Sequence, residues 1–594
     1  MIKDGNILST LKKHAECRPN STAILFNGDF LTYRELYNMV CHLATGIIKS
    51  NVKEGERIAV VMDNSLDMVA CIIAILSVRC VVLPIDTELP LNRIKIMIED
   101  ANPQIAFCNN NKIKEKIDSL GYFCVTIDAI SKEEFFADNL EKYMTEFKSD
   151  AAAFCMYTSG STGKPKGVLI SYRGIINHVN SKIKLLELSS DSNISMSFNI
   201  GFVASIWQLV TPIYLGAKLT IYSRSLIKQP YTFFRRIQED QLSFISITPS
   251  TLKSYLYYVS RKNKKISLLR LERIVLTGEK IPPSLVNAFY KEYEHIELIN
   301  AYGQTECSDD TFHYIIPQKE WSDNIPIGKP IDNILGYVLN ESLQKTMVGE
   351  IGELYIGGCG VVNGYLNDDA LSSVKFVSLP GTDGLFYRTG DIVKLNERGE
   401  VVYIGRRDNQ VKIRGYRVEL EEIESYISLY SQINEVIVVS REKEGNTLLE
   451  CLYTSDSLVD KTKLNEFACA IMPQYMVPAR FTQICEFSYN SNGKIDRNIN
   501  YSELTVLEGD KPQSYNTLYG EIYGVIRKYI GIDNVKPDTK IATCGIDSMS
   551  FVQMIIELED EFGFEFSDNK MILSEFETIA DIIKYVESEI SKND

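Results

Sequence analysis

A loop of glycine, hydroxyl and lysine side chains, residues 157–168 with the sequence YTSGSTGKPKGV, carries the residue types that bind phosphate. Backbone amides beside glycine, hydroxyl groups and ammonium groups together suit the oxygens of a polyphosphate. The candidate donors are Thr158, Ser159, Gly160, Ser161, Thr162, Gly163, Lys164, Lys166 and Gly167. Residues 151–157 and 168–170 are predicted to be short buried strands, so we expect an anchored loop and not a flexible linker.

The loop resembles a P-loop but lacks one of its required residues. A P-loop has a serine or threonine directly after its lysine, whose hydroxyl binds magnesium. Here Pro165 follows Lys164, and a proline at this point also disfavours the helix start that a P-loop feeds. A P-loop ATPase is therefore excluded.

Composition sets limits on the class of protein. The chain has 594 residues, long enough for several domains, and a formal net charge of -15. Acidic surfaces repel phosphate backbones, so we expect no nucleic-acid partner and no binding to a membrane. The thirteen cysteines include no C-x-x-C pair, and no apolar run suits a signal peptide or a membrane span. We therefore predict a cytoplasmic protein.

The elements that must position the loop follow an α/β pattern up to about residue 400. Short β-branched apolar runs alternate with helical patterns, as in a domain built on a parallel sheet. The predicted strands include 57–61, 81–84, 105–108 and 273–276. Between 337 and 405, strands separated by glycine pairs predict a small β-rich layer.

The remaining chain divides into three predicted parts. Residues 406–498 indicate a compact α+β unit, and the polar segment 499–516 is the best candidate for a linker. Residues 517–594 are acidic and mainly helical. Ser548 is predicted at the start of a helix there, a position that a serine also takes as a simple N-cap.

Taken together, the motifs resemble the adenylation domain of nonribosomal peptide synthetases, in the adenylate-forming superfamily, followed by a peptidyl carrier protein domain. Eight motifs occur in the family's order across nearly the whole chain: LTYREL at 31–36, LPID at 83–86, the loop at 157–168, NAYGQTE at 300–306, GELYIGG at 352–358, YRTGD at 387–391, GRRDNQVKIRG at 405–415 and NGK at 492–494.

The resemblance implies a fold and a division into domains. It implies an α/β protein whose large N-terminal adenylation subdomain, residues 1–405, combines α/β layers with the β-rich layer. A small mobile α+β subdomain would occupy 406–498. The linker at 499–516 would lead to a four-helix carrier (thiolation) domain at 517–594.

The resemblance also implies a reaction that these residue types suit. A carboxylate attacks the α-phosphorus of ATP and pyrophosphate leaves, while cations and amides stabilise the charge that develops on oxygen. Glu306 with Thr305 would hold Mg²⁺ and phosphate, since hard oxygen ligands suit that ion. Lys494 would bridge the substrate carboxylate and the phosphate. The implied ATP-binding residues are the 157–168 loop, Gly278, Glu279, Asn300, Tyr302, Asp391 and Arg406.

A second implied step transfers the acyl group to a thiol. None of the cysteines has a recognisable nucleophile setting, so a prosthetic thiol is needed. By resemblance, Ser548 in the sequence GIDS carries 4'-phosphopantetheine, which a phosphopantetheinyl transferase must attach. Asp408 matches the family's hinge, about which the small subdomain would rotate between the two steps; alternatively, Asp408 is only a loop residue.

Nine positions match the family's acid-binding pocket: Val203, Ala204, Trp207, Ile247, Val275, Thr277, Ala301, Asp309 and Asp310. Enzymes for α-amino acids place an aspartate where this chain has Val203, and a buried ammonium without a partner is unfavourable. A valine first and an aspartate last resemble pockets for β-alanine, so we predict a small β-amino acid. If Asn199 is the true match, an aryl acid is expected instead.

Three alternatives remain beside this prediction. An α-amino or hydroxy acid would undergo the same chemistry. An acyl-CoA ligase shares the adenylation core, although Ser548 and its surrounding segment argue against it. A catalytically idle carrier scaffold is disfavoured by Lys494, Asp391 and Glu306. Neither a condensation signature nor a thioesterase G-x-S-x-G elbow is visible. We therefore expect a downstream condensation or acyl-transfer enzyme as partner.

Overall fold

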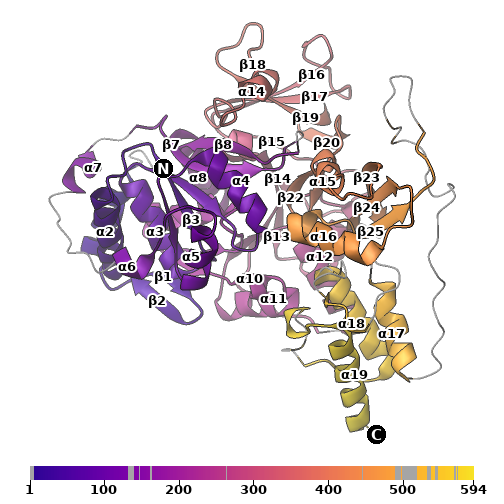
Figure 1. Cartoon of the computed structure of the whole chain (residues 1–594). Coiled ribbons are helices and arrows are strands. Elements are labelled where there is room, and N and C mark those ends of the chain that lie inside the picture. The colour runs from indigo at the N-terminus through magenta and orange to yellow at the C-terminus, as the bar shows by residue number, and fades with distance from the viewer. Residues whose placement is uncertain are drawn as a thin grey trace.

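The computed structural model describes most of the chain (Figure 1). The described residues are 6–130, 140–145, 148–160, 163–262, 264–443, 446–488, 495, 497, 518–530, 537–541, 546, 548–567, 570 and 573–593. Ser161, Thr162, Lys494 and the predicted linker 499–516 lie outside them. For Ser548 the structure describes the backbone only.

A six-stranded sheet forms the centre of the N-terminal part. Its order is β6 (Cys124–Thr126), β5 (Ile105–Cys108), β3 (Arg57–Val61), β4 (Val81–Ile85), β7 (Ala152–Thr158) and β8 (Lys166–Ser171). All neighbours pair in parallel except β7 and β8, which are antiparallel. The strands predicted in this region are confirmed. Helix α3 (Leu66–Ser77) is buried over most of its length, which suits its almost wholly apolar sequence.

A second sheet provides the other wall of the site. Its order is β11 (Phe244–Ile247), β12 (Arg273–Thr277), β13 (Glu297–Gln304), β14 (Asp309–Ile316) and β15 (Lys329–Pro330). Strands β11 to β13 are parallel, whereas β13 and β14 form an antiparallel pair. Helices α12 (Pro249–Lys262) and α13 (Pro283–Glu292) belong to this part, and α8 (Tyr172–Leu186) contacts β14.

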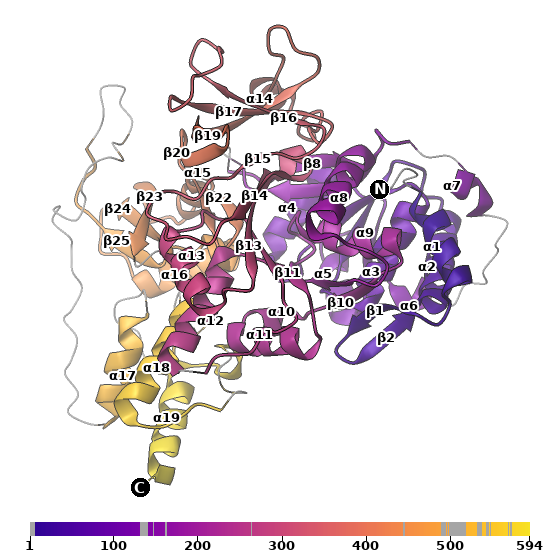
Figure 2. The same ribbon diagram turned by 180° about the vertical axis from the view of Figure 1, so that it is seen from behind.

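A third sheet has the order β2 (Asp29–Thr32), β1 (Thr22–Phe26), β10 (Lys218–Ile221) and β9 (Asn193–Met196). Helix α9 (Ser205–Leu215) lies between β9 and β10 in the chain and packs on both strands. The predicted β-rich layer is also present. It contains β16 (Ile334–Leu339), β17 (Ile351–Gly358), β18 (Phe376–Val377), β19 (Phe386–Leu395) and β20 (Val401–Arg406), at the top of Figure 2.

A small α+β unit follows β20. The hairpin β21 (Gln410–Ile413) and β22 (Tyr416–Glu419) precedes helix α15 (Leu420–Ile427). A three-stranded sheet of β23 (Glu435–Lys443), β24 (Asn446–Thr454) and β25 (Arg480–Gln483) is packed with α16 (Lys461–Ile471). This unit has its own apolar core, which includes Val418, Ile423 and Tyr453.

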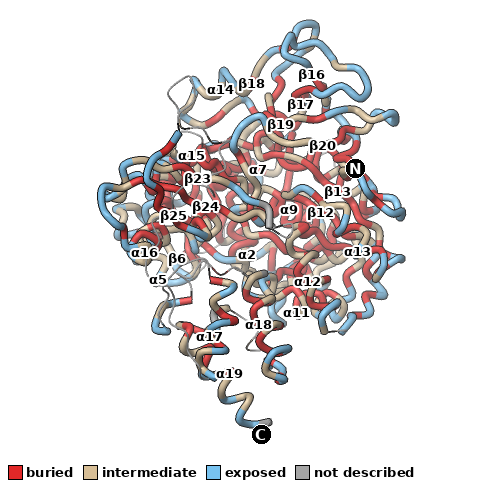
Figure 3. The backbone as a smooth tube through the Cα atoms, turned by 90° about the vertical axis from the view of Figure 1, so that its right-hand side faces the viewer, coloured by how far each residue is buried: buried red, intermediate tan, exposed pale blue. Residues whose placement is uncertain are grey.

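The C-terminal part is helical, as predicted. Its described elements are α17 (Leu518–Lys528), α18 (Ser548–Phe562), a 3-10 turn at Leu573–Glu575 and α19 (Ile579–Asn593). Helix α18 begins at Ser548, which confirms the predicted serine at a helix start. Buried residues continue through these helices in Figure 3, and they form a core separate from that of the large domain. No described helix is long and apolar enough to cross a membrane.

Candidate active site

The phosphate-binding candidate loop is the tip of an antiparallel hairpin. Thr158 of β7 pairs with Lys166 of β8, so the chain turns back into a strand where a P-loop would enter a helix. Ser159 and Lys166 are buried, whereas the side chain of Lys164 is exposed. The Thr158 hydroxyl is buried and has no hydrogen-bond partner among the described residues. A phosphate oxygen would satisfy it, so the loop fits the predicted ligand.

The small unit covers this loop. Ser159 Oγ donates a hydrogen bond of 2.7 Å to the carbonyl oxygen of Arg417, and Gly160 N donates to Glu422 Oε2 at 3.2 Å. The same carboxylate accepts from Arg93 Nη1 at 2.6 Å, in an ion pair that is almost wholly buried. Hairpin β21–β22 and the start of α15 therefore close over the loop.

Glu306 lies fully buried beneath hairpin β21–β22. Arg417 Nη1 donates to both of its oxygens, at 2.7 and 2.8 Å, and the Tyr365 hydroxyl donates at 2.7 Å. Burial alone would raise the pKa of Glu306, but the Arg417 and Lys166 cations lower it to about 2. Glu306 is thus an anion that needs a cation beside it. Mg²⁺ would also fit this requirement, but in this structure Arg417 binds both oxygens of the Glu306 carboxylate.

Lys166 is the second cation of this region. Its ammonium lies 3.9 Å from Glu419 Oε1 and 4.9 Å from the centroid of the Tyr365 ring. Burial and the nearby Arg417 charge lower the pKa of Lys166 to about 8. Arg417, Tyr365 and Glu419 were not predicted as site residues; Arg417 lies two positions beyond the 405–415 motif, which is the only sequence signal for it.

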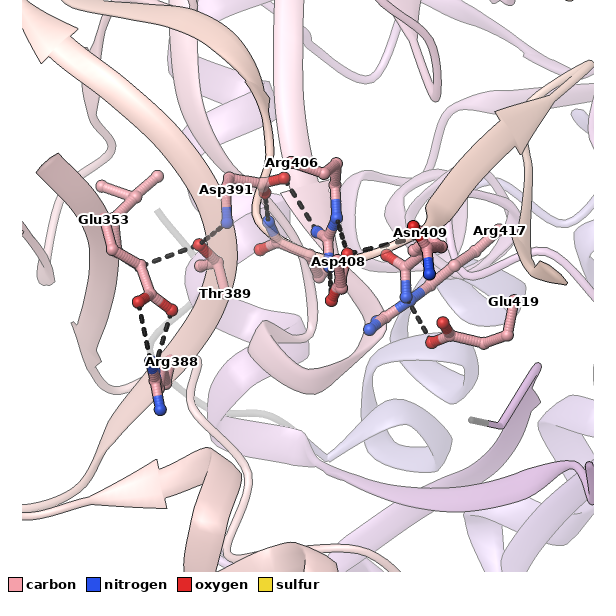
Figure 4. Close-up of polar contacts among 12 residues, drawn as sticks. Glu353, Arg388, Thr389, Asp391, Arg406, Asp408, Asn409, Arg417 and Glu419 are labelled. Carbon is pink, nitrogen blue, oxygen red and sulfur yellow. Dashed lines mark hydrogen bonds and ion pairs between the residues drawn. The ribbon is translucent and has the colours of Figure 1, made fainter. Parts of the chain in front are cut away.

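Asp391 on β19 is the centre of a polar network (Figure 4). Arg406 Nη1 donates to Asp391 Oδ1 at 2.8 Å and binds Asp408 through Nε and Nη2 at 2.8 and 2.7 Å. The Tyr302 hydroxyl donates to Asp391 Oδ2, and Gln304 Nε2 donates to the same oxygen at 3.2 Å. Gln304 thereby joins the network. Predicted residues from three separate motifs meet here.

Residues predicted to surround adenine are also brought together. A cavity of about 1170 Å³ is lined by Gly278, Glu279, Asn300 and Tyr302. Asn300 Nδ2 donates to the Pro326 carbonyl at 2.8 Å. Gly278 has φ +89, and a Cβ on it would lie 3.1 Å from the Cα of Gly415, so glycine is required where the hairpin β21–β22 approaches.

The predicted acid pocket divides into three groups. Val203, Thr277 and Asp309 line a cavity of about 130 Å³, which Thr158, Thr305 and Asp391 also line. Ile247 and Ala301 line the larger cavity. Ala204, Trp207, Val275 and Asp310 are buried and line neither cavity.

Asn199, the alternative match for Val203, lines both cavities. Its Oδ1 accepts a hydrogen bond of 2.8 Å from the backbone N–H of Gly201. Asn199 therefore closes a local turn before α9, a common use of asparagine. This contact gives the residue a structural role.

Behind the pocket lies a buried ionic cluster that was not predicted. Lys182 Nζ is 2.6 Å from Asp310 Oδ2, and Thr277 Oγ1 donates to Asp310 Oδ1 at 3.1 Å. His178 Nε2 and His313 Nε2 lie 3.4 and 3.8 Å from Asp310 Oδ2. His178 and Lys182 are four residues apart on α8, so they share one helix face; that spacing is the only sequence signal.

Helix α18 of the C-terminal helical part packs against the large domain. Val552 and Ile556 of α18 pack with Tyr258 of α12. Lys262 Nζ lies 2.5 Å from Glu559 Oε2, and Lys264 Nζ lies 3.1 Å from Glu565 Oε2. Lysines of the large domain thus pair with acids of the C-terminal part, and the helix that makes this contact begins at Ser548.

Comparison with known proteins identifies both parts of the chain. Residues 11–366 match the family model described as AMP-binding enzyme, and residues 521–586 match the phosphopantetheine attachment site. The chain is 31% identical to surfactin synthase subunit 2 of Bacillus subtilis over 99% of its own length, which is 16% of that protein. The chain spans between about one sixth and about half of the length of the first curated relatives that it matches.

Solved structures resemble the whole arrangement. An artificially fused adenylation–PCP di-domain nonribosomal peptide synthetase from Klebsiella oxytoca is 25% identical, with a TM-score of 0.69 over 80% of this chain and 93% of that one. A second protein with adenylation and PCP domains, bound to a vinylsulfonamide inhibitor, has a TM-score of 0.82 at 20% identity, over 98% of this chain and 97% of that one, and supports the fold alone.

The fold and the family match define an adenylate-forming acid–thiol ligase that uses ATP. The carrier match adds an attachment domain for 4'-phosphopantetheine. The chain belongs to the AMP-binding enzymes and has the organisation of a nonribosomal peptide synthetase adenylation domain fused to a peptidyl carrier protein. Mg²⁺ is typical of this family.

Proposed function

We propose that the chain activates a small amino acid, favoured as a β-amino acid such as β-alanine, and loads it onto its own carrier domain. The carboxylate oxygen would bond to the α-phosphorus of ATP as pyrophosphate leaves. The phosphopantetheine thiol, once deprotonated, would then bond to the acyl carbon as AMP leaves. The observation that carries this proposal is the docking of α18 on α12 in the same chain as the Asp391 and Glu306 networks.

The proposed residue roles follow the contacts of each side chain. The 157–168 loop and Lys166 would bind the phosphates, and Asp391 with Arg406 would hold the ribose. Glu306 would hold Mg²⁺, which supplies charge neutralisation on the phosphates, and Lys494 would act with it during adenylation. Ser548 would bear the phosphopantetheine. A soluble acyl-CoA product is disfavoured because the carrier domain supplies a thiol within the chain.

We propose that the observed arrangement is the one that loads the carrier. Arg417 holds Glu306 in the place that Mg²⁺ would need, while α18 is docked. Rotation at Asp408 would withdraw hairpin β21–β22 and let Lys494 enter for adenylation. Asp408 is bound by Arg406 at the junction of β20 and β21, a position suited to a hinge.

A substrate panel tests this proposal. Pyrophosphate exchange is measured with β-amino, α-amino, hydroxy and aryl acids. The mass of the intact loaded protein is then measured by mass spectrometry. We expect the strongest exchange with a small β-amino acid and a matching mass increment on the carrier. Preference for a standard α-amino acid would overturn the argument from Val203. A phosphopantetheinyl transferase and a downstream condensation or acyl-transfer enzyme are the proposed partners.

A further inference from the structure

The buried cluster behind the acid pocket contains two adjacent carboxyl groups whose negative charges must be neutralised. Two acids, Asp309 and Asp310, lie next to each other at the start of β14, and both are buried. Two like charges in a dry site cannot both stay uncompensated. The surrounding contacts show which of the two is neutralised by the protein.

Asp310 is neutralised within the protein. The Lys182 ammonium, with no exposed surface, lies 2.6 Å from Asp310 Oδ2, and Thr277 donates to Oδ1. Burial opposes the ionisation of Asp310, yet the Lys182 charge and the nearby His178 ring lower the pKa of Asp310 well below the usual range. Asp310 and Lys182 thus form a closed pair that does not line the cavity.

Asp309 has no such cation: burial and the charge of the adjacent Asp310 raise the pKa of Asp309 well above its usual range, so a cation in the cavity would be needed to keep it ionised. It lines the 130 Å³ cavity together with two other carboxylates, Asp86 and Asp391. Asp86 and Asp391 each have an arginine, Arg224 at 2.7 Å and Arg406 at 2.8 Å. Asp309 Oδ2 has no hydrogen bond among the described residues, and His178 Nδ1 lies 3.5 Å from it.

The neighbouring histidines do not supply a charge. Burial lowers the pKa of His178, and burial together with the Lys182 charge lowers the pKa of His313 to about 4. Both rings are therefore neutral at neutral pH. His178, Asp310 and His313 also lie close enough to hold a metal ion, but the Lys182 ammonium already provides a cation to Asp310.

We propose that Lys182 is a specificity-determining residue: it neutralises Asp310, so that Asp309 alone binds the substrate ammonium and the pocket accepts a small acid carrying one ammonium group. This inference rests on the proposed amino-acid activation and names the residue that sets the substrate charge. Lys182 acts through Asp310 and is not a catalytic residue. Its ammonium, 5.3 Å from the Trp207 ring, is fixed from a second side by a cation–π contact.

The test compares small amino acids with two relatives of each, a hydroxy analogue without the ammonium and a diamino analogue with two. For β-alanine these are 3-hydroxypropionate and 2,3-diaminopropionate. Pyrophosphate exchange is measured for the full chain. The wild type should prefer the amino acid over both analogues, and Asp309→Asn should reduce the preference over the hydroxy analogue by about tenfold or more.

Lys182→Met should raise the ratio of diamino acid to amino acid by about tenfold or more, because the unbalanced charge of Asp310, behind the cavity wall, then adds to that of the adjacent Asp309 and favours a second ammonium in the cavity. The variant Lys182→Met/Asp310→Asn removes both charges and should return this ratio to that of the wild type. A merely structural role would lower exchange for all acids and leave the ratios unchanged. If Lys182→Met does not fold, Asp309→Asn still tests the proposal, because an unchanged preference over the hydroxy analogue would show that Asp309 does not bind the ammonium.

The outcomes separate the two proposals. Wild-type preference for uncharged or aryl acids would overturn both the amino-acid assignment and the role of Asp309. Amino-acid preference in the wild type, with unchanged ratios in Lys182→Met, would overturn the role of Lys182 only. A double variant that behaves like Lys182→Met would also overturn it, because the charge balance would then not be the cause.

Discussion

The ion pair between Arg417 and Glu306 offers the sharpest test of the proposed two-step mechanism. It joins β22 of the small unit to the turn between β13 and β14 of the large domain, and Glu306 has no exposed surface. We expect Arg417→Met to slow transfer to the carrier far more than adenylation. The substitution keeps much of the side-chain volume and removes the charge and both hydrogen bonds.

The magnitude follows from the pKa of Glu306, which lies at about 2 instead of the ordinary 4.5. A difference of this size corresponds to about 3 kcal/mol, which is the net of the burial penalty and the larger opposing stabilisation by Arg417, Lys166 and Tyr365. Because the pair links two units, its loss would shift their arrangement instead of unfolding either. The carrier-loading arrangement would become less populated by up to about two orders of magnitude.

The sign of the pH dependence is fixed by the same value. The folded-state pKa of Glu306 is depressed, so its stabilising contribution is fully present above about pH 4.5 and is lost as the pH falls toward 2. The difference between wild type and Arg417→Met in carrier loading should therefore stay constant over the neutral range.

The assay measures pyrophosphate exchange and single-turnover loading on the same protein. Loading should fall by about tenfold or more in Arg417→Met, while exchange stays within about threefold of wild type. Arg480→Met is the matched control, since Arg480 lies on β25 of the same unit with a largely exposed side chain. An equal loss of both activities, or unchanged loading, would refute the switching role of the pair.

Three further predictions concern the carrier and its movement. Ser548→Ala should abolish the phosphopantetheine mass increment and leave exchange intact, with Ser550→Ala as control; an increment on the Ser548 variant would contradict the attachment site. Asp408→Pro should preserve exchange and block loading, whereas parallel loss of both would contradict the hinge. Val552→Asp should place a charge in the apolar contact with Tyr258 and slow loading by about tenfold or more; loading at the wild-type rate would show that this contact is not used.

The sequence by itself determined the class of fold and the reaction class. Alternating short apolar runs predicted the strands at 57–61 and 105–108, because strand periodicity is a local property. The proline after Lys164 excluded a P-loop, and the antiparallel pairing of β7 and β8 agrees with that exclusion. Motif order gave the adenylation and carrier domains that the family comparisons bear out.

Only the tertiary structure showed which acidic residues of the site are neutralised and by which partners. The sequence does not distinguish the adjacent residues Asp309 and Asp310. In the structure Asp309 lines a cavity, whereas Asp310 pairs with Lys182, more than a hundred residues away in the chain. Arg417 reaches Glu306 in the same way, across two units. Burial and long-range partners set the strength of electrostatic interactions, and neither is written in the local sequence. The residue types were therefore predictable, while their pairing was not.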